Sequence, residues 1–325
     1  MKIEPIKSSA GYTVAVRVLT PYNQMKEQDF IDLIREFGTV VWKKDKATTE
    51  EYIDFQMKVG YHQAADIWCN DDKFPQIYRV TNLKIEADHE AEGLFGHGEL
   101  DWHCNILFTP DSEECVGLRA VEVPKGSQTI MANSLPFWNN LSEEKKLYYE
   151  TLYLAITNKI QDTYEQTLAH YVLPTAELKD FDKKRASRCV QRAMNYDIPE
   201  DTFLPPRFEK KNFLKMISNH PLGMEGVYFP HLNLEYMADS NHQKLENHYE
   251  VYQEIKKEYI DDDKYHYYHE WEEGDIAFME QLTGVHRRNN VWEEQGLDPI
   301  THKRELQRTS FWYKAEFREH TGRCI

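Results

Sequence analysis

Short runs of apolar, aromatic and β-branched residues, each about as long as a β-strand, recur along the 325-residue chain and constrain its fold more than any other feature. Segments with helical spacing lie between them. Strands that are divided by helices and continue to the far C-terminus favour an α+β protein with a double-stranded β-helix, or jelly-roll, core and flanking helices. The expected strands are residues 77–82, 100–108, 116–123, 127–133, 225–232, 265–271, 274–280 and 305–317.

Four segments carry the spacing or the start signals of helices. Gly38 follows the first of them as a stop signal, because glycine commonly ends a helix. Thr48 begins a Thr-Thr-Glu-Glu start, and Ser142 is the expected N-cap of the third helix. The expected helices are residues 24–37, 48–59, 145–159 and 241–260.

The composition does not change between the two halves of the chain, so we expect a single domain over residues 1–325. A hydrophobic content of 41% is enough for a sizeable core at this length. Residues 160–215 are polar and mixed in charge, and they match neither the helical nor the strand pattern. We interpret this segment as a helical or irregular insertion that forms either a lid or surface decoration.

The charge and the cysteine pattern restrict the partners and the setting. A net charge of −16 disfavours binding to nucleic acid or to anionic membranes, so the expected partner is a small-molecule substrate. The first residues lack the apolar core of a signal peptide, and no run is long enough to span a membrane. The five cysteines form no CxxC pair, which fits a reducing, cytoplasmic setting.

The stretch LDWHCN, residues 100–105, has the spacing of half a metal site. Side chains alternate along a strand, so Asp101, His103 and Asn105 share one face, and Trp102 and Cys104 share the other. A histidine and an oxygen donor can then reach one ion. The expected second histidine is His286, just past the strand 274–280. Two histidines and one carboxylate suit non-haem Fe(II) and leave positions open for co-substrates. The alternative for a single histidine is an ordinary packed residue.

Further motifs occur in an order that resembles the taurine dioxygenase-like family of Fe(II)/2-oxoglutarate-dependent oxygenases, within the clavaminate synthase-like superfamily. The resemblance runs from about residue 75 to residue 315. The family's Trp-His-x-Asp strand is matched by WHCN, with Asn105 in the aspartate position. The remaining matches are Thr129 to Asn133 for a Thr-x-x-x-Asn run, His220-Pro221 before an apolar segment, Trp271 to Asp275 for a Trp-x-x-Gly-Asp turn, and Arg304 and Arg308 for an Arg-x-x-x-Arg pair.

The resemblance implies a role for each matching residue. His103 and His286 would bind iron, with Asn105 as the third ligand and Asp101 in reserve. Thr129 would bind 2-oxoglutarate through its hydroxyl group. Either Arg304 or Arg308 would pair with the distal carboxylate of 2-oxoglutarate, because a guanidinium group matches a carboxylate. The alternative for both arginines is surface salt bridging. The implied cofactor is Fe(II), with 2-oxoglutarate and dioxygen as co-substrates.

The neutral side chain of Asn105 leaves three readings of the chemistry open. In the first, the enzyme oxidises a C–H bond, typically by hydroxylation. In the second, chloride fills a vacant metal position, as in related halogenases that carry a small residue there. In the third, the protein binds a ligand without turnover. Arg308 and Arg119 favour a small anionic or amino-acid-like substrate. The resemblance also leaves a homo-oligomer open.

Overall fold

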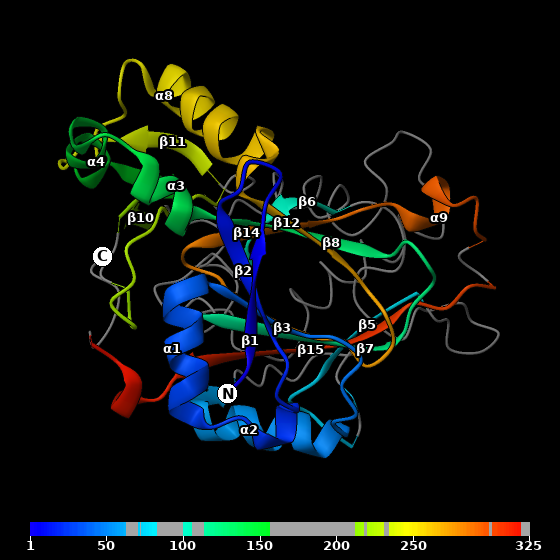
Figure 1. Cartoon of the computed structure of the whole chain (residues 1–325). Helices are drawn as coiled ribbons and strands as arrows, with labels where there is room; N and C mark the ends of the chain where they lie inside the picture. The colour runs from blue at the N-terminus through cyan, green and yellow to red at the C-terminus, as the bar shows by residue number, and fades with distance from the viewer. Residues whose placement is uncertain are drawn as a thin grey trace, which may run out of the picture.

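The structure is a computed structural model that describes residues 1–62, 71, 73–82, 100–105, 114–156, 212–217, 220–230, 234–298 and 301–319. These residues form two large β-layers, a smaller third sheet and the helices around them (Figure 1). The protein is therefore a mixed α and β structure, as the sequence predicted. No helix in the described ranges is long and apolar enough to cross a membrane.

The first layer is an eight-stranded sheet that contains both ends of the described chain. All of its strand pairs are antiparallel except β2–β3. Its strands follow the order β1 (Ile3–Lys7), β2 (Thr13–Val18), β3 (Thr39–Trp42), β13 (Ile276–Glu280), β7 (Cys115–Glu122), β15 (Glu305–Tyr313) and β4 (Gly60–His62), and β5 (Tyr78–Thr81) also pairs with β15.

The second layer is a four-stranded antiparallel sheet that carries the candidate metal-binding histidines. Its order is β12 (His266–Glu270), β8 (Gln128–Asn133), β14 (Gly284–Arg288) and β6 (Leu100–His103). A third, three-stranded sheet is not hydrogen-bonded to either of these sheets and has the order β10 (Asn212–Lys215), β9 (Tyr153–Ile156) and β11 (Leu234–Ala238).

An apolar cluster joins the inner faces of the two main sheets. Leu118 and Leu306 contribute from the eight-stranded sheet, and Met131 contributes from β8 of the four-stranded sheet. Because side chains alternate along a strand, this cluster identifies which residues face the interior between the sheets. Arg304 and Arg308 share the parity of Leu306 and therefore point into this interior.

Helices α1 (Glu27–Phe37) and α2 (Thr49–Val59) cover the outer face of the eight-stranded sheet (Figure 1). Gly38 ends α1 with φ of 65°, a left-handed conformation that glycine adopts without strain. Thr48 and Glu51 form a reciprocal capping box that begins α2. Both helix boundaries are therefore set by local signals in the sequence.

The outer face of the four-stranded sheet packs against a second set of helices and the third sheet. Trp102, Val285 and Ile130 point to this side and join one apolar cluster with residues from the helices. Figure 1 shows α3, α4 and α8 gathered beside β10 and β11. The helices are α3 (Ser134–Asn140), α4 (Glu143–Glu150), α8 (His248–Ile255) and the following π-helix η3 (Lys256–Asp261). The shorter elements are η1 (Tyr22–Gln24), η4 (Asp263–Tyr265), α9 (Val291–Glu294) and η5 (Ala315–Phe317).

Most predicted elements are confirmed, but three predictions were wrong. The helix over 145–159 is replaced by α4 and then β9, because Leu154 and Ile156 are buried in pairing with β10 and β11. Residues 225–230 form no strand, although Val227, Tyr228 and Phe229 are buried in the outer cluster. The helix over 241–260 begins only at His248. Of the expected insertion at 160–215, only β10 lies within the described residues.

Candidate active site

Two distant parts of the chain bring His103 and His286 together on adjacent strands. The antiparallel register of β6 and β14 places the two residues directly opposite each other. Their ring centroids lie 4.3 Å apart, and the residues are 6% and 8% exposed. His286 also pairs with Met131, a residue of the inner cluster, so both imidazoles face the interior between the sheets. The expectation that His286 lies past the end of a strand was wrong, because it is the central residue of β14.

Asn105 lies just beyond the point where the pairing of β6 with β14 ends. Its backbone N–H donates to the Gln281 side-chain oxygen at 3.0 Å, and both residues are buried. Gln281 belongs to the connection between β13 and β14, so the element that leads to His286 also holds Asn105. Asp101 lies in β6, but its side chain is outside the described residues.

The structure places two of the three predicted donors, His103 and His286, next to each other. Among the described residues, no group of three histidine, cysteine, aspartate or glutamate side chains could hold a metal ion. His103 and His286 supply two imidazole nitrogens, which suit Fe(II). An amide oxygen from Asn105 would complete a set of three, as a neutral and weaker donor than a carboxylate.

Arg304 is a buried cation immediately before β15. Its side chain is on the interior face, the residue is 2% exposed, and its Nε donates to Ser127 Oγ at 2.9 Å. No carboxylate of the described residues pairs with it. Burial lowers the pKa of the Arg304 guanidinium to about 9, so it stays protonated at neutral pH. A buried, protonated guanidinium is costly without a counter-ion, so the position favours binding of an anion.

Ser127 places a hydroxyl group against Arg304, and Thr129 follows two residues later. Both residues are buried and have the same strand parity at the start of β8. Thr129 Oγ1 accepts a hydrogen bond of 2.9 Å from Trp271 Nε1, and Ser127 Oγ accepts from Arg304. Ser127 thus contacts Arg304, and Trp271 contacts Thr129. The sequence did not single out Ser127 or Trp271 for binding.

Arg308 occupies a different place along the same strand. It lies four residues after Arg304, which corresponds to about 13 Å along a strand. Its guanidinium carbon is 5.1 Å from the ring centroid of Tyr78, and both residues are buried. The two arginines of the Arg-x-x-x-Arg motif thus line separate parts of the interior, and Arg304 is the one that is hydrogen-bonded to Ser127.

Arg288 is an interior residue that the sequence analysis missed. It lies two residues after His286 on β14, is buried, and pairs in register with Thr129. Strand parity would have placed it on the face of His286 if β14 had been predicted as a strand. Its guanidinium carbon lies 5.7 Å from the Trp292 ring centroid.

A buried polar network supports the Trp271 side of the site. His269 Nδ1 lies 2.7 Å from the Tyr267 hydroxyl oxygen, and His269 Nε2 lies 3.3 Å from Asp275 Oδ2. Burial lowers the pKa of His269, so its neutral form is favoured. Burial alone would raise the pKa of Asp275, but hydrogen bonds from His269 and Lys43 hold it below the usual range. Asp275, the aspartate of the Trp-x-x-Gly-Asp turn, therefore holds this turn in place through its contacts with His269 and Lys43.

Several other residues considered in the sequence lie elsewhere. Arg119 points to the outer face and donates to Ala47 and Gln307, so the expected role in substrate binding is wrong for it. His220 is buried with its Nε2 2.9 Å from a carboxylate oxygen of Glu280. Tyr228 and Phe229 belong to the outer apolar cluster. The sequence also offers His97 and His231 as further histidines that could bind a metal and Trp68 as an aromatic that could line a pocket, and all three lie outside the described residues.

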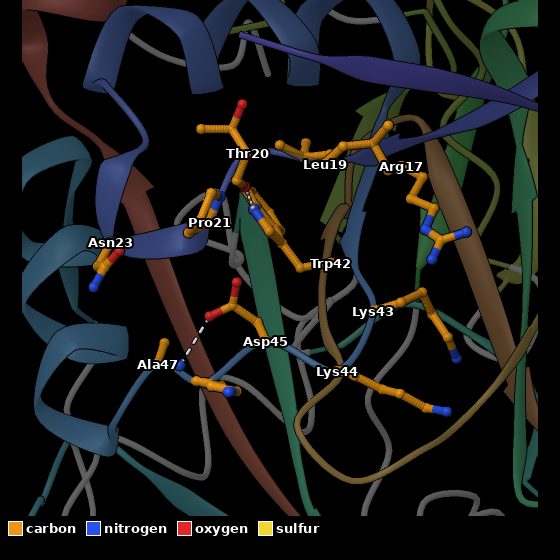
Figure 2. Close-up of a pocket in the computed structure, with 12 residues that line it drawn as sticks. Arg17, Leu19, Thr20, Pro21, Asn23, Trp42, Lys43, Lys44, Asp45 and Ala47 are labelled. Carbon is orange, nitrogen blue, oxygen red and sulfur yellow. Dashed lines mark hydrogen bonds between the residues drawn. The ribbon is translucent and has the colours of Figure 1, made fainter.

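A surface cavity of about 400 Å³ lies between the residues that follow β2 and those that follow β3. Figure 2 shows Arg17, Lys43 and Lys44 along one side of it and Trp42 near its centre. Lys43 turns away to pair with Asp275, and Lys44 pairs with Glu272 at 2.8 Å. None of the predicted site residues lines this cavity, so it is separate from the histidine pair.

The comparisons with known proteins identify the family of the chain. The sequence pattern of the taurine catabolism dioxygenase TauD, TfdA family matches residues 2–310. The chain is therefore a dioxygenase of the TauD, TfdA family. No curated protein sequence matches the chain.

Three solved structures share the fold at low sequence identity. A Burkholderia xenovorans protein assigned as an alpha-ketoglutarate-dependent taurine dioxygenase superposes with a TM-score of 0.64 at 13% identity, over 96% of this chain and 93% of that one. A taurine dioxygenase from the same organism gives 0.63 at 13% identity, over 96% and 89%. AAD-2 in complex with Mn(II) and N-oxalylglycine gives 0.62 at 14% identity, over 97% and 98%.

Proposed function

We propose that this protein is an Fe(II)/2-oxoglutarate-dependent oxygenase that oxidises a C–H bond of a small anionic or amino-acid-like substrate. The observation that carries the proposal is the direct pairing of His103 with His286 on the interior face of two adjacent strands. Membership of the dioxygenase family supports it. We further propose that the two facing sheets are the halves of a jelly roll within one domain, and that the setting is reducing and cytoplasmic.

The residues of the site have distinct proposed tasks. His103, His286 and Asn105 would hold the iron, and Asp101 remains the reserve ligand. Iron that is bound with 2-oxoglutarate and dioxygen supplies the oxidising chemistry of this family. The interior position of the histidines would keep bulk water from the reacting groups, because both residues are nearly fully buried.

The co-substrate site is proposed at the start of β8. Arg304 and Thr129 would bind the distal carboxylate of 2-oxoglutarate, and the contact of Arg304 with Ser127 supports Arg304 over Arg308 for this task. Arg308, further along β15, is then available for an anionic group of the substrate. A charge-assisted pair with a guanidinium fixes both the position and the orientation of a carboxylate.

The proposal is tested by adding Fe(II) and then 2-oxoglutarate to the metal-free protein without oxygen. We expect a visible charge-transfer band that saturates with 2-oxoglutarate. A band would show a working metal site despite Asn105. If neither the wild type nor Asn105→Asp gives a band, the oxygenase proposal is wrong, and a ligand-binding protein becomes the better description.

Asn105→Asp is expected to strengthen Fe(II) binding by about 10-fold or more, since an anionic oxygen binds a hard divalent cation better than a neutral amide oxygen. The change keeps the size of the side chain, and the backbone N–H bond to Gln281 does not involve the altered atoms. Calorimetric titration of Fe(II) or Mn(II) into both proteins measures the effect. Equal affinities would mean that Asn105 is not a ligand and that another group, such as Asp101, completes the site.

A further inference from the structure

The hydroxyl groups of Ser127 and Thr129 each accept a hydrogen bond from a nitrogen that can only donate. Arg304 Nε and Trp271 Nε1 carry protons and cannot accept, so the two hydroxyl oxygens accept from them, at 2.9 Å in each case. Each hydroxyl still has one proton to donate. Neither gives it to a protein acceptor within the part of the chain that the structure describes. Both hydroxyl protons therefore remain available to a bound ligand.

The spacing of the two hydroxyl groups fits one carboxylate. Ser127 and Thr129 are two residues apart and have the same parity, so their Cα atoms are separated by about 6.7 Å along the chain. A carboxylate placed between them can accept one hydrogen bond on each oxygen atom. The Arg304 guanidinium lies beside Ser127 and supplies the positive charge. Because all three residues are buried, these bonds would form out of contact with bulk water.

We propose that Ser127 is a further binding residue for the distal carboxylate of 2-oxoglutarate, and that Trp271 is a positioning residue that makes Thr129 a donor. This inference rests on the proposed function. Arg304 has two tasks in this arrangement, because it attracts the carboxylate and also donates to Ser127 Oγ, so that the Ser127 proton is left for the carboxylate. The carboxylate then accepts hydrogen bonds from two hydroxyl groups in addition to the guanidinium.

The surroundings of Trp271 hold its indole N–H in place. The His269 ring packs against the indole at a centroid distance of 4.2 Å, and Asp275 holds His269 at 3.3 Å. The Trp271 backbone N–H also donates to the Ser127 carbonyl oxygen at 2.8 Å. One residue therefore ties both hydroxyl-bearing positions to the β12–β13 turn, so the donors are oriented before the co-substrate binds.

Two probes separate this role from a general effect on the site. The first is 2-oxoglutarate, and the second is 2-oxopentanoate, which has a methyl group in place of the distal carboxylate. Each is titrated calorimetrically into the full-length Mn(II)-loaded protein, which binds without turnover. We expect Ser127→Ala to weaken 2-oxoglutarate binding about 10-fold, because it removes one hydrogen bond to a charged group. The affinity for 2-oxopentanoate should stay unchanged, which also shows that the variant is folded.

Ser310→Ala is the matched control. Ser310 is a fully buried serine on the interior face of β15, and its hydroxyl has no hydrogen-bond partner among the residues that the structure describes. The Ser310→Ala variant should bind 2-oxoglutarate with the wild-type affinity. Trp271→Phe keeps an aromatic ring but removes the N–H, and we expect about a threefold loss of 2-oxoglutarate affinity with no loss for 2-oxopentanoate.

The outcomes distinguish this inference from the proposed function. If the wild type binds 2-oxoglutarate and Ser127→Ala binds it equally well, the role of Ser127 is wrong and the proposed function stands. If Ser127→Ala weakens both probes equally, the residue does not act on the distal carboxylate. If the wild type does not bind 2-oxoglutarate at all, the proposed function fails, and this inference fails with it.

Discussion

Replacement of His103 by alanine is expected to abolish iron binding and, with it, the formation of succinate from 2-oxoglutarate. His103 and His286 are the two imidazole donors of the proposed site, and they face each other with ring centroids 4.3 Å apart. Loss of a partner that only orients a metal ligand typically costs about 10–100-fold in affinity, so loss of a ligand should cost more than about 100-fold. Anaerobic Fe(II) titration and a succinate assay measure the two effects.

His242→Ala is a suitable control for this experiment. His242 is an exposed imidazole that stacks on Phe213 with a centroid distance of 4.2 Å, away from the interior of the two main sheets. Its removal should change neither iron affinity nor succinate formation. Wild-type iron affinity in His103→Ala would contradict the metal assignment, provided that its circular dichroism spectrum shows a folded protein.

Strand alternation alone was enough to predict which side chains around His103 share a face. The common face of His103 and Asn105, and the outward direction of Trp102 and Cys104, follow from a period of two along a strand. The structure buries Cys104 in the outer cluster, as this alternation requires. The identity of the strand that lies opposite His103 depends on long-range pairing, which no local pattern encodes.

The residues that the sequence missed depend on such pairing. β14 begins two residues after Leu282 and contains charged residues at Arg287 and Arg288, so it lacks the apolar run that marks a strand. Arg287 is accommodated because its guanidinium carbon lies 5.3 Å from the Trp102 ring centroid. Without β14, neither the strand position of His286 nor the pairing of Arg288 with Thr129 could be inferred.

The helix predicted over residues 145–159 was wrong for a related reason. Tyr149, Leu152 and Leu154 are apolar at intervals that fit either a helix or a strand. The structure ends α4 at Glu150 because the next residues pair with β10 and β11 on both sides. Pairing partners from residues 212–215 and 234–238 therefore decided the conformation, against the local preference.

Arg304→Gln is expected to weaken 2-oxoglutarate binding by about 100-fold or more. The change removes the buried cation that would pair with the distal carboxylate, and breaking a buried ion pair costs about 3–5 kcal/mol. The 2-oxoglutarate affinity of Arg304→Lys should lie between those of the wild type and Arg304→Gln. An ammonium group keeps the positive charge but lacks the planar guanidinium that would contact both the ligand and Ser127. Calorimetry with the Mn(II)-loaded proteins measures the affinities.

Thermal stability gives an independent measurement of the interaction between Arg304 and 2-oxoglutarate. Arg304 is buried without a carboxylate partner among the described residues, so its charge does not stabilise the ligand-free protein, and Arg304→Gln should not lower its melting temperature. The wild type at 100 times the Kd of 2-oxoglutarate should gain about 2.7 kcal/mol, whereas the variant should gain little at the same concentration.

Arg308→Gln decides between the two arginines of the motif. Arg308 lies further along β15 and packs on Tyr78, so its replacement should leave the 2-oxoglutarate affinity close to that of the wild type and should affect an anionic substrate instead. The opposite result, with a large loss in Arg308→Gln and none in Arg304→Gln, would exchange their roles. That result would also contradict the proposed carboxylate site at Ser127, because Arg304 is the arginine that contacts the Ser127 hydroxyl group.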